Sequence, residues 1–219
     1  ATEVPSVARK VLVSEIDRHI LCFGANPIGS ADQDPLLIRW SSQESLTDWE
    51  PTATNTAGDL RLSQGSEIVT ALRTSRQILV FTDQTLHSVQ FTGAPFVFGT
   101  ALLADNVRIA GPNAAVSIND LVFWMGQENF YVYDGRVQPI PCSVRDYVFS
   151  DLNRNQSFKI HAGTLGSQTE ILWFYCSESS DEIDRYVIYN YGEQVWYYGT
   201  LARTAWNDRG AGQRSYPQA

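Results

Sequence analysis

Short apolar runs separated by polar turns recur along the chain, and this pattern predicts β-strands. The clearest stretch is RQILVFTDQTLHSVQFTG, residues 76–93. Its ILVF run is apolar at every position, which is typical of a strand covered on both faces, whereas LHSVQF alternates as a half-exposed strand does. We therefore predict a β-hairpin that turns at Thr82–Gln84, with Ile78–Phe81 buried on both faces and Asp83 exposed in the turn.

The same plan occurs four times along the sequence. Each repeat has a polar turn, a strongly apolar strand, a second turn and a second strand. The strong strands are Ile20–Phe23, Ile78–Phe81, Leu121–Trp124 and Ile171–Tyr175. They begin 58, 43 and 50 residues apart, which is close to the repeat length of β-propeller blades. A blade is a four-stranded antiparallel sheet that must bury its faces against its neighbours.

Weaker strand patterns complete the repeats. They precede the strong strands as KVLVSEI, EIVTALR, NAAVSIN and FKIHAGTL. In the first, third and fourth repeats, a later turn leads to a last strand that contains Trp49, Val137 or Trp196. We predict an all-β fold, a single β-propeller domain over residues 1–219 in which about four four-stranded antiparallel blades are visible. The blades cover approximately residues 7–62, 66–95, 107–142 and 157–203.

One segment departs from the β pattern. In CSVRDYVFSDLNRNQ, residues 142–156, the apolar positions can share one helical face. Ser143 has the chemistry of an N-cap, and Asp146 follows it three residues later, as in a weak capping box. We predict a short helix near residues 143–153, between two sheets.

The two ends of the chain carry no complete repeat. The first residues, ATEVPSVARK, lack an initiator Met and the apolar core of a signal peptide. The tail from Leu201 to Ala219 is rich in Arg, Gly and polar residues. We expect the chain to be a fragment of a longer protein, and its blades to belong to a larger or incomplete propeller.

Composition limits the classes of partner. The sequence is 43% hydrophobic, 12% aromatic and 18% charged, which is typical of a folded chain rather than a disordered one. Its net charge is −8, and only two lysines accompany fourteen arginines. A protein that grips nucleic-acid phosphates needs a basic surface, so we expect no tight binding of DNA. No apolar run approaches the roughly 20 residues of a membrane helix, so we expect no membrane partner.

Residues able to catalyse reactions or bind metals are few and dispersed. The cysteines are Cys22, Cys142 and Cys176, and the histidines are His19, His87 and His161. None has the spacing of a disulfide framework or a zinc site, so we interpret them as structural. The acidic loop SESSDEIDR, residues 177–185, lacks the residue order and the glycine of a calcium loop, and we interpret it as a solvated hairpin loop. We expect no catalytic residue, metal or cofactor.

Aromatic residues are unusually dense in the fourth repeat. They are Trp173, Phe174, Tyr175, Tyr186, Tyr189, Tyr191, Trp196, Tyr197 and Tyr198. One interpretation places them in the core of a blade. The other makes them a contact surface with another subunit, because Tyr and Trp are frequent interface anchors. The candidate subunit-contact aromatics along the whole chain are Trp49, Trp196, Tyr197, Tyr198 and Trp206.

Four segments in a fixed order resemble a known family. They are IVTALRTSRQILVFTDQTLHSVQFTG, VRIAGPNAAVSINDLVFWMGQENFYVYDGRVQPIP, VRDYVFSDLNRNQ and EILWFYCSESSDEIDRYVIYNYGEQVWYYG. Their order resembles that of phage tail proteins of the P22-type packaged-DNA stabilisation (tail hub or nozzle) family. The likeness covers roughly residues 67–199, and its motifs are structural signatures rather than catalytic ones.

The resemblance implies a structural virion protein without enzymatic activity. It would be made in the host cytoplasm and would then form a homo-oligomeric, hexameric tail ring below the portal and its adaptor, near other tail proteins such as a fibre or needle. The ring would extend the channel, help to retain the packaged genome and let it pass during viral genome ejection. An acidic channel wall would let DNA slide without sticking, because phosphates would find few cations there.

Two other classes of function remain open from the residues alone. A β-propeller can serve as a recognition module for a host glycan or protein, through exposed aromatics and a concave polar face. A glycosidase would need two carboxylates about 5–10 Å apart in a cleft. Only the loop residues Asp83, Asp105 and Asp134 are available for that role, and nothing in the sequence brings them together.

Overall fold

The structure is a computed structural model that describes residues 3–93, 95–118, 120–165, 169–203 and 205–208. The chain forms two compact units, Ala1–Arg108 and Ile109–Ala219. Within the described residues, each unit contains two four-stranded antiparallel sheets. This confirms the all-β prediction and is consistent with a β-propeller-like arrangement. None of the described helices is long and apolar enough to cross a membrane.

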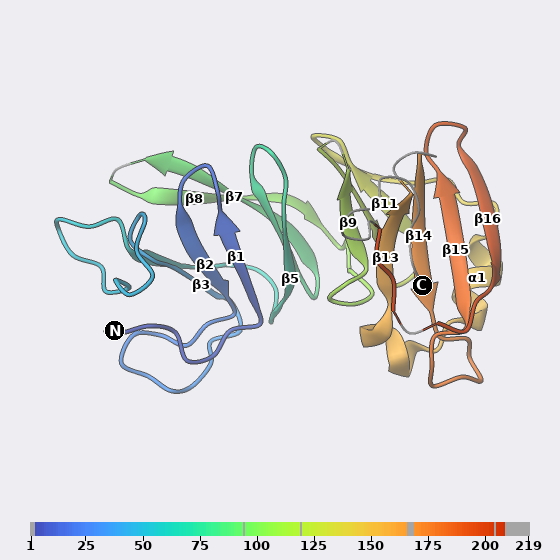
Figure 1. The fold of residues 1–219 in the computed structure, drawn as a ribbon, viewed down its shortest axis with the longest axis horizontal. Helices are drawn as coiled ribbons and strands as arrows, with labels where there is room; N and C mark the ends of the chain where they lie inside the picture. Colours follow the sequence, from blue (N-terminus) through green and yellow to red (C-terminus); the bar gives the residue numbers. More distant parts are fainter. Residues whose placement is uncertain (1–2, 94, 119, 166–168, 204, 209–219) are drawn as a thin grey trace. The chain divides into compact units, whose positions relative to one another are not determined.

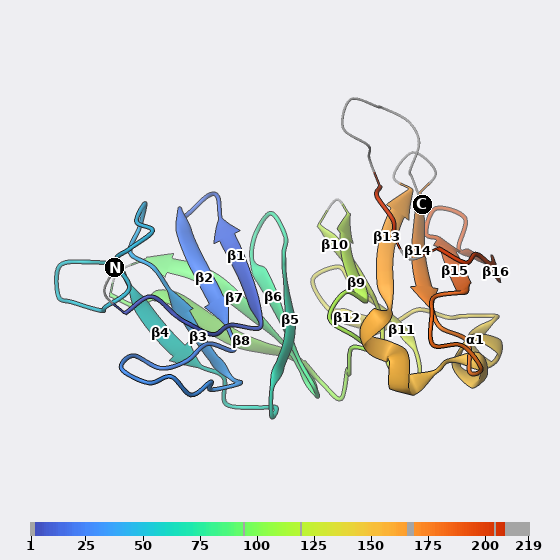
Figure 2. The same ribbon diagram turned by 60° about the horizontal axis from the view of Figure 1, so that its bottom comes forward.

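In the first unit, both sheets keep their strands in sequence order (Figures 1 and 2). The strands of the first sheet are β1 (Lys10–Ser14), β2 (His19–Phe23), β3 (Leu37–Trp40) and β4 (Gly58–Arg61). Those of the second sheet are β5 (Ile68–Arg73), β6 (Ile78–Thr82), β7 (Thr85–Gly93) and β8 (Val97–Asp105). Each strand pairs antiparallel with the next, as the strands of a blade do.

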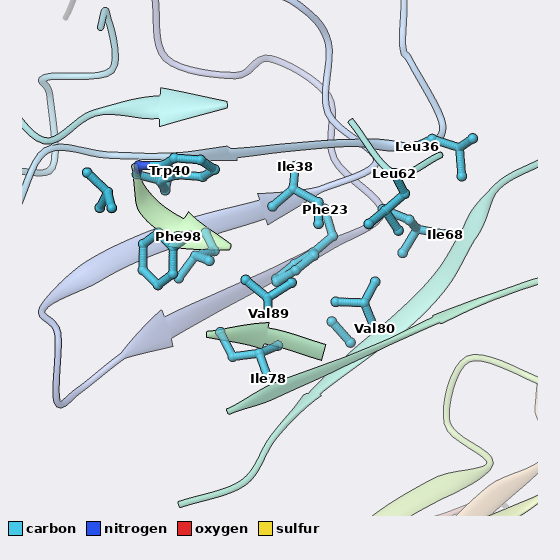
Figure 3. Close-up of a cluster of buried hydrophobic side chains, with 13 residues drawn as sticks. Phe23, Leu36, Ile38, Trp40, Leu62, Ile68, Ile78, Val80, Val89 and Phe98 are labelled. Atoms are coloured by element: carbon cyan, nitrogen blue, oxygen red, sulfur yellow. The ribbon is translucent and has the colours of Figure 1, made fainter. Parts of the chain in front are cut away.

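The core of the first unit lies between its two sheets. Figure 3 shows Phe23 and Ile38 of the first sheet directed toward Val80 and Val89 of the second. Alternate residues of a strand point to opposite faces, so a strand buried throughout must be covered on both sides. All four residues of Ile78–Phe81 are at most 5% exposed, which confirms the sequence prediction for this strand.

The second unit repeats the plan. Its first sheet has the order β12-β11-β10-β9, and its second has the order β13-β14-β15-β16. The strands of the first are β9 (Ala115–Ile118), β10 (Leu121–Met125), β11 (Phe130–Tyr133) and β12 (Val137–Pro139). Those of the second are β13 (His161–Leu165), β14 (Glu170–Tyr175), β15 (Arg185–Asn190) and β16 (Val195–Thr200).

Helical residues connect the two sheets of the second unit. Helix α1 (Arg145–Asp151) confirms the predicted short helix, and a 3₁₀ helix at Arg154–Lys159 follows it. The predicted N-cap is wrong: Val144 occupies that position, and no side chain caps the helix. The helix is held instead by packing, since its Val148 is fully buried and Phe149 contacts Phe130.

Two strand predictions are corrected by the structure. The last strand of the first sheet contains not Trp49 but residues 58–61, because Trp49 lies in the long loop that follows Trp40. The second sheet has a fourth strand, β8, which the sequence pattern did not reveal. Its register against β7 shifts twice, and the extra residue at Leu103 breaks the alternation by which strands are recognised.

The predicted exposure of Asp83 is also corrected. The hairpin turn itself lies where expected, between β6 and β7, but Asp83 is only half-exposed. Its carboxylate accepts hydrogen bonds from the backbone N–H of Ser66 at 2.8 Å, from that of Glu67 at 3.3 Å and from the Ser66 hydroxyl at 2.6 Å. The turn is therefore tied to the segment that enters the sheet.

Candidate functional site

The aromatic cluster of the second unit is first of all a core. Trp173 of β14 and Trp196 of β16 have ring centroids 4.8 and 4.7 Å from that of Phe130 in β11. Tyr189 of β15 stacks on Trp196 at 4.5 Å. These rings come from both sheets because alternate residues of β14, β15 and β16 point to the same side. The core interpretation is confirmed for the aromatics that are at most 8% exposed, which are Trp173, Phe174, Tyr175 and Tyr189.

Hydrogen bonds fix the two tryptophans of this core. The Trp173 indole N–H donates to the carbonyl of Ala114 at 3.0 Å, and the Trp196 indole N–H donates to the carbonyl of Pro141 at 2.9 Å. A buried indole N–H needs such a partner, since an unpaired donor costs free energy. Both rings are therefore held in one orientation.

A smaller set of aromatics remains accessible on β16 and α1. Tyr198 is 51% exposed, Tyr197 is 48% exposed, and Tyr147 of α1 is 45% exposed. The rings of Tyr147 and Tyr198 lie 4.4 Å apart. We call Tyr147, Tyr197 and Tyr198 the tyrosine surface, in which Tyr197 points to the opposite face of the sheet from Tyr198. Sequence reasoning identified two of its members but missed Tyr147, which only the fold brings beside β16.

The other predicted contact aromatics differ in position. Trp49 is 3% exposed and packs with Cys22 and Ala25, so its burial removes it from any contact surface. Trp196 is half-buried and belongs to the core described above. Trp206 is half-buried and packs on Phe174, with ring centroids 5.0 Å apart.

Trp206 packs on Phe174 because a glycine of β13 leaves space for the indole ring. A Cβ atom on Gly163 would lie 2.4 Å from the Trp206 indole nitrogen, so only glycine allows this approach. Asp208 then fastens the segment, since its carboxylate accepts hydrogen bonds from the Thr164 N–H at 2.9 Å and from the Thr164 hydroxyl at 2.8 Å.

Beside this segment lies a pocket of about 420 Å³. Phe158, Phe174 and Trp206 supply aromatic walls. The polar lining includes Lys159, His161, Glu182 and Arg203. A pocket with apolar walls and a few polar groups is suited to a small ligand. No motif predicted this site, because its residues come from distant positions in the sequence.

The charges of the pocket are partly paired. The Lys159 ammonium lies 3.2 Å from a carboxylate oxygen of Glu182 and donates to the carbonyl of Asp181 at 2.5 Å. Burial lowers the pKa of His161, although the nearby Asp208 acts in the opposite direction. His161 is therefore neutral near pH 7, and Lys159 and Arg203 are the positive groups of the lining.

The acidic loop forms an ordered hairpin connection. Asp184 accepts hydrogen bonds from the backbone N–H and the hydroxyl of Ser177, each at 2.8 Å, and Asp181 accepts one from Gln156 at 3.0 Å. Over the part of the chain that the structure describes, no group of three or more His, Cys, Asp or Glu residues is placed to hold a metal ion.

The cysteines have the environment of unreactive thiols. Cys22 and Cys176 are buried, Cys142 is half-buried, and all three are free. Burial raises the pKa of Cys22 and that of Cys142 to about 11, so both thiols stay protonated near neutral pH. The thiolate is the nucleophile and the metal ligand, so neither cysteine is prepared for such chemistry.

Comparisons with known proteins add no assignment. No protein-family model matches the chain, and no curated protein matches it. The tyrosine surface and the pocket beside Trp206 are therefore the two features on which a function can be argued.

Proposed function

We propose that this chain is a structural subunit of a phage tail, in the hub or nozzle ring that extends the channel below the portal. One observation carries the proposal: four sheets of four strands are built on a single plan and buried through strongly apolar central strands. Such sheets make a stiff scaffold when neighbouring blades cover their faces. A channel wall needs this stiffness.

Subunit contact in the ring would use the tyrosine surface. Tyr combines a large apolar ring with a hydroxyl, so it can be exposed in the free subunit and buried in an interface. The three rings of the surface are each between 45% and 51% exposed. They are also held in place, because β16 is anchored through Trp196 and α1 through Phe149.

The negative net charge suits a channel protein past which DNA moves without binding to it. The net charge of −8 leaves few free cations for phosphates. Several arginines are already paired with carboxylates, as in Arg61 with Asp34 at 2.7 Å and Arg185 with Asp151 at 3.1 Å. A channel wall lined mainly by arginines in the assembled particle would contradict this part of the proposal.

Electron microscopy of purified phage particles tests the proposed function directly. We expect density for this chain as a hexameric ring next to the portal adaptor. Particles assembled with Tyr147→Ala and Tyr198→Ala should carry fewer complete rings and leak more DNA, whereas the matched change Phe158→Ala, on another exposed aromatic of the same unit, should not. Absence of the chain from particles would overturn the proposal.

The pocket supports a second candidate function, recognition of a glycan. Aromatic walls can stack on a sugar, and Lys159 and Arg203 favour a sugar that carries a carboxylate. Calorimetry with a uronic acid would test this function. Binding should weaken in Trp206→Ala and in Lys159→Ala but not in Arg136→Ala, which removes an exposed cation elsewhere in the same unit. No binding heat with the native chain would exclude this candidate.

A further inference from the structure

The end strands of the four sheets differ in how their open edges are protected. An end strand turns the N–H and C=O of every second residue away from its sheet, and these groups can pair with a strand of another chain. Proteins usually prevent such pairing with charged side chains, proline, bulges or a covering element.

Most end strands of this protein are protected in these ways. Strand β4 carries Asp59 and Arg61, and β12 contains Pro139 and follows Arg136. Strands β1 and β5 lie beside each other, and so do β9 and β13. These six edges are therefore poor templates for a further strand.

Strands β8 and β16 are the exceptions. No Asp, Glu, Lys or Arg occurs from Thr85 to Ala104, a segment that includes nearly the whole of the β7–β8 hairpin. The two register shifts, at Leu103 of β8 and at Thr92 of β7, leave Phe98–Leu102 as a regular segment between them. Strand β16, Val195–Thr200, also carries no charge. We call these two segments the β8 edge and the β16 edge.

Both edges are accessible. Thr100, Ala101 and Leu102 are exposed on β8, as are Val195 and Tyr197 on β16. Among the described residues, the backbone of these two strands makes one hydrogen bond outside the sheet pairing, from the Phe98 N–H to the carbonyl of Phe96. The outward-facing groups of both edges are thus available to a further strand.

The two edges complement each other in side-chain size. The β8 edge presents the small residues Gly99, Thr100 and Ala101, whereas the β16 edge presents the large residues Tyr197 and Tyr198. Aromatic side chains cover small residues well on a neighbouring strand, and this is a known way to stabilise glycine in a sheet. Pairing one β8 edge with another would leave small side chains facing each other and would bury little apolar area.

We propose that the β8 edge of one copy pairs with the β16 edge of the next copy, so that a sheet continues from subunit to subunit. This inference rests on the proposed ring. A contact between two different surfaces is heterologous, and it builds a ring when the rotation between successive copies closes. Backbone hydrogen bonds would supply affinity, and the tyrosine surface would supply specificity.

A complementation experiment on the full chain tests the pairing. One variant carries Thr100→Lys and Leu102→Lys on the β8 edge, and the other carries Val195→Lys and Tyr197→Lys on the β16 edge. All four positions are exposed, so both variants should fold, which circular dichroism would check. The matched control carries Val11→Lys and Val13→Lys, two exposed alternate positions on β1.

Sedimentation velocity gives the readout. We expect the native chain and the control to assemble, each edge variant alone to be monomeric, and an equimolar mixture of the two variants to form a dimer. The intact β16 edge of the first variant can pair with the intact β8 edge of the second. The two remaining edges of that pair carry the lysines, so assembly should stop at a dimer. Assembly of either variant alone, or a mixture that stays monomeric, would overturn the pairing.

Cysteine crosslinking identifies the partners. Ala101→Cys and Tyr197→Cys chains, joined with a short bismaleimide, should give a crosslinked dimer only when the two are mixed. A dimer from Ala101→Cys chains alone would mean that two β8 edges pair, which overturns the proposal. If phage particles made with both edge variants still contain rings, the proposed function stands. The same result would exclude edge pairing. A native chain that never self-associates would overturn edge pairing, and particle images would then test the ring separately.

Discussion

The two units share a strand plan but differ in what fills their cores. In the first unit the residues between the sheets are mainly aliphatic, such as Leu21, Ile38 and Val80. In the second unit aromatic rings have a larger part, and the ring of Phe130 packs against that of Trp173 with centroids 4.8 Å apart. The difference teaches that strand pairing and alternation determine the sheet, while the side chains that fill it can change in kind.

The units also differ in how they treat polar groups. The second unit pairs the indole N–H groups of Trp173 and Trp196 with backbone carbonyls. The first unit buries a whole charge, because Arg39 of β3 is 1% exposed. The Arg39 guanidinium donates to the carbonyl of Glu3 at 2.6 Å, to that of Asn26 at 3.0 Å and to that of Trp49 at 3.5 Å. It therefore holds together the segment before β1, the connection between β2 and β3 and the loop between β3 and β4.

Truncation of a central ring should have the largest effect. We expect Trp173→Ala to lower the free energy of unfolding by about 3–5 kcal/mol, because it opens a cavity and leaves the Ala114 carbonyl without its indole donor. Leu21→Ala in the first unit should cost about 2–5 kcal/mol. Hydrogen exchange followed by mass spectrometry would locate each loss.

The residues whose hydrogen exchange becomes faster show whether the two units unfold separately. Each unit has its own core, so faster exchange should be confined to residues 109–208 for Trp173→Ala and to residues 3–108 for Leu21→Ala. Leu46→Ala, on a side chain that is 74% exposed, serves as the control and should leave exchange unchanged. Uniform acceleration in both units from either core variant would show that they unfold as one.

Replacement of the buried charge should have the next largest effect. Arg39→Met keeps much of the volume but removes the donors for three carbonyls, so we expect a loss of about 1–3 kcal/mol in urea unfolding. Arg39→Lys tests whether charge alone suffices, and it should not, because an ammonium cannot reproduce the planar fork. A more stable Arg39→Met protein would contradict this account and would show that the buried charge is a net cost.

The sequence predicted most of the fold because the central strands carry a strong signal. The ILVF run of β6 and the ILWFY run of β14 are too apolar for an exposed segment, and both are buried. Strand β8 escaped prediction for a physical reason. Its bulge at Leu103 and its positive φ at Val97 interrupt the alternation, and Gly99 and Ala101 weaken its apolar character.

Contacts between distant segments were much harder to predict. Trp49 has the character of an exposed interface residue, yet a loop network buries it, in which Asn55 donates to both oxygens of Asp48 at 3.1 Å. The pocket combines residues near 113, 160, 182 and 205, which no local motif relates. The unpaired edges depend on which strands end each sheet, and only the topology reveals that.

A smaller effect is expected from pH. Burial lowers the pKa of His19 and that of His87 in the first unit, and that of His161 in the second. Because the unfolded chain binds protons near pH 6.5 before the folded one does, stability should fall as pH drops below about 6.5, by at most about 1.4 kcal/mol per pH unit for each histidine.

The first unit should therefore lose more stability than the second between pH 7 and pH 5. Hydrogen exchange at the two pH values would measure this difference. His87→Gln keeps a partner for the Thr85 hydroxyl, which lies 2.9 Å from His87 Nε2, and should reduce the pH dependence of the first unit only. His161→Gln is the matched control in the second unit. Equal pH dependence of both units in the native chain would contradict the burial argument.

The smallest change expected is a gain in the aromatic core. Tyr175 of β14 is fully buried, and its hydroxyl has no hydrogen-bond partner among the described residues. An unpaired buried hydroxyl costs free energy, so Tyr175→Phe should raise the free energy of unfolding by up to about 1 kcal/mol in urea titration. Tyr197→Phe, on an exposed hydroxyl, should change nothing. A loss of stability in Tyr175→Phe would instead mean that a buried water bonds to the hydroxyl, and the second unit would then hold a polar site as deep as that of Arg39 in the first.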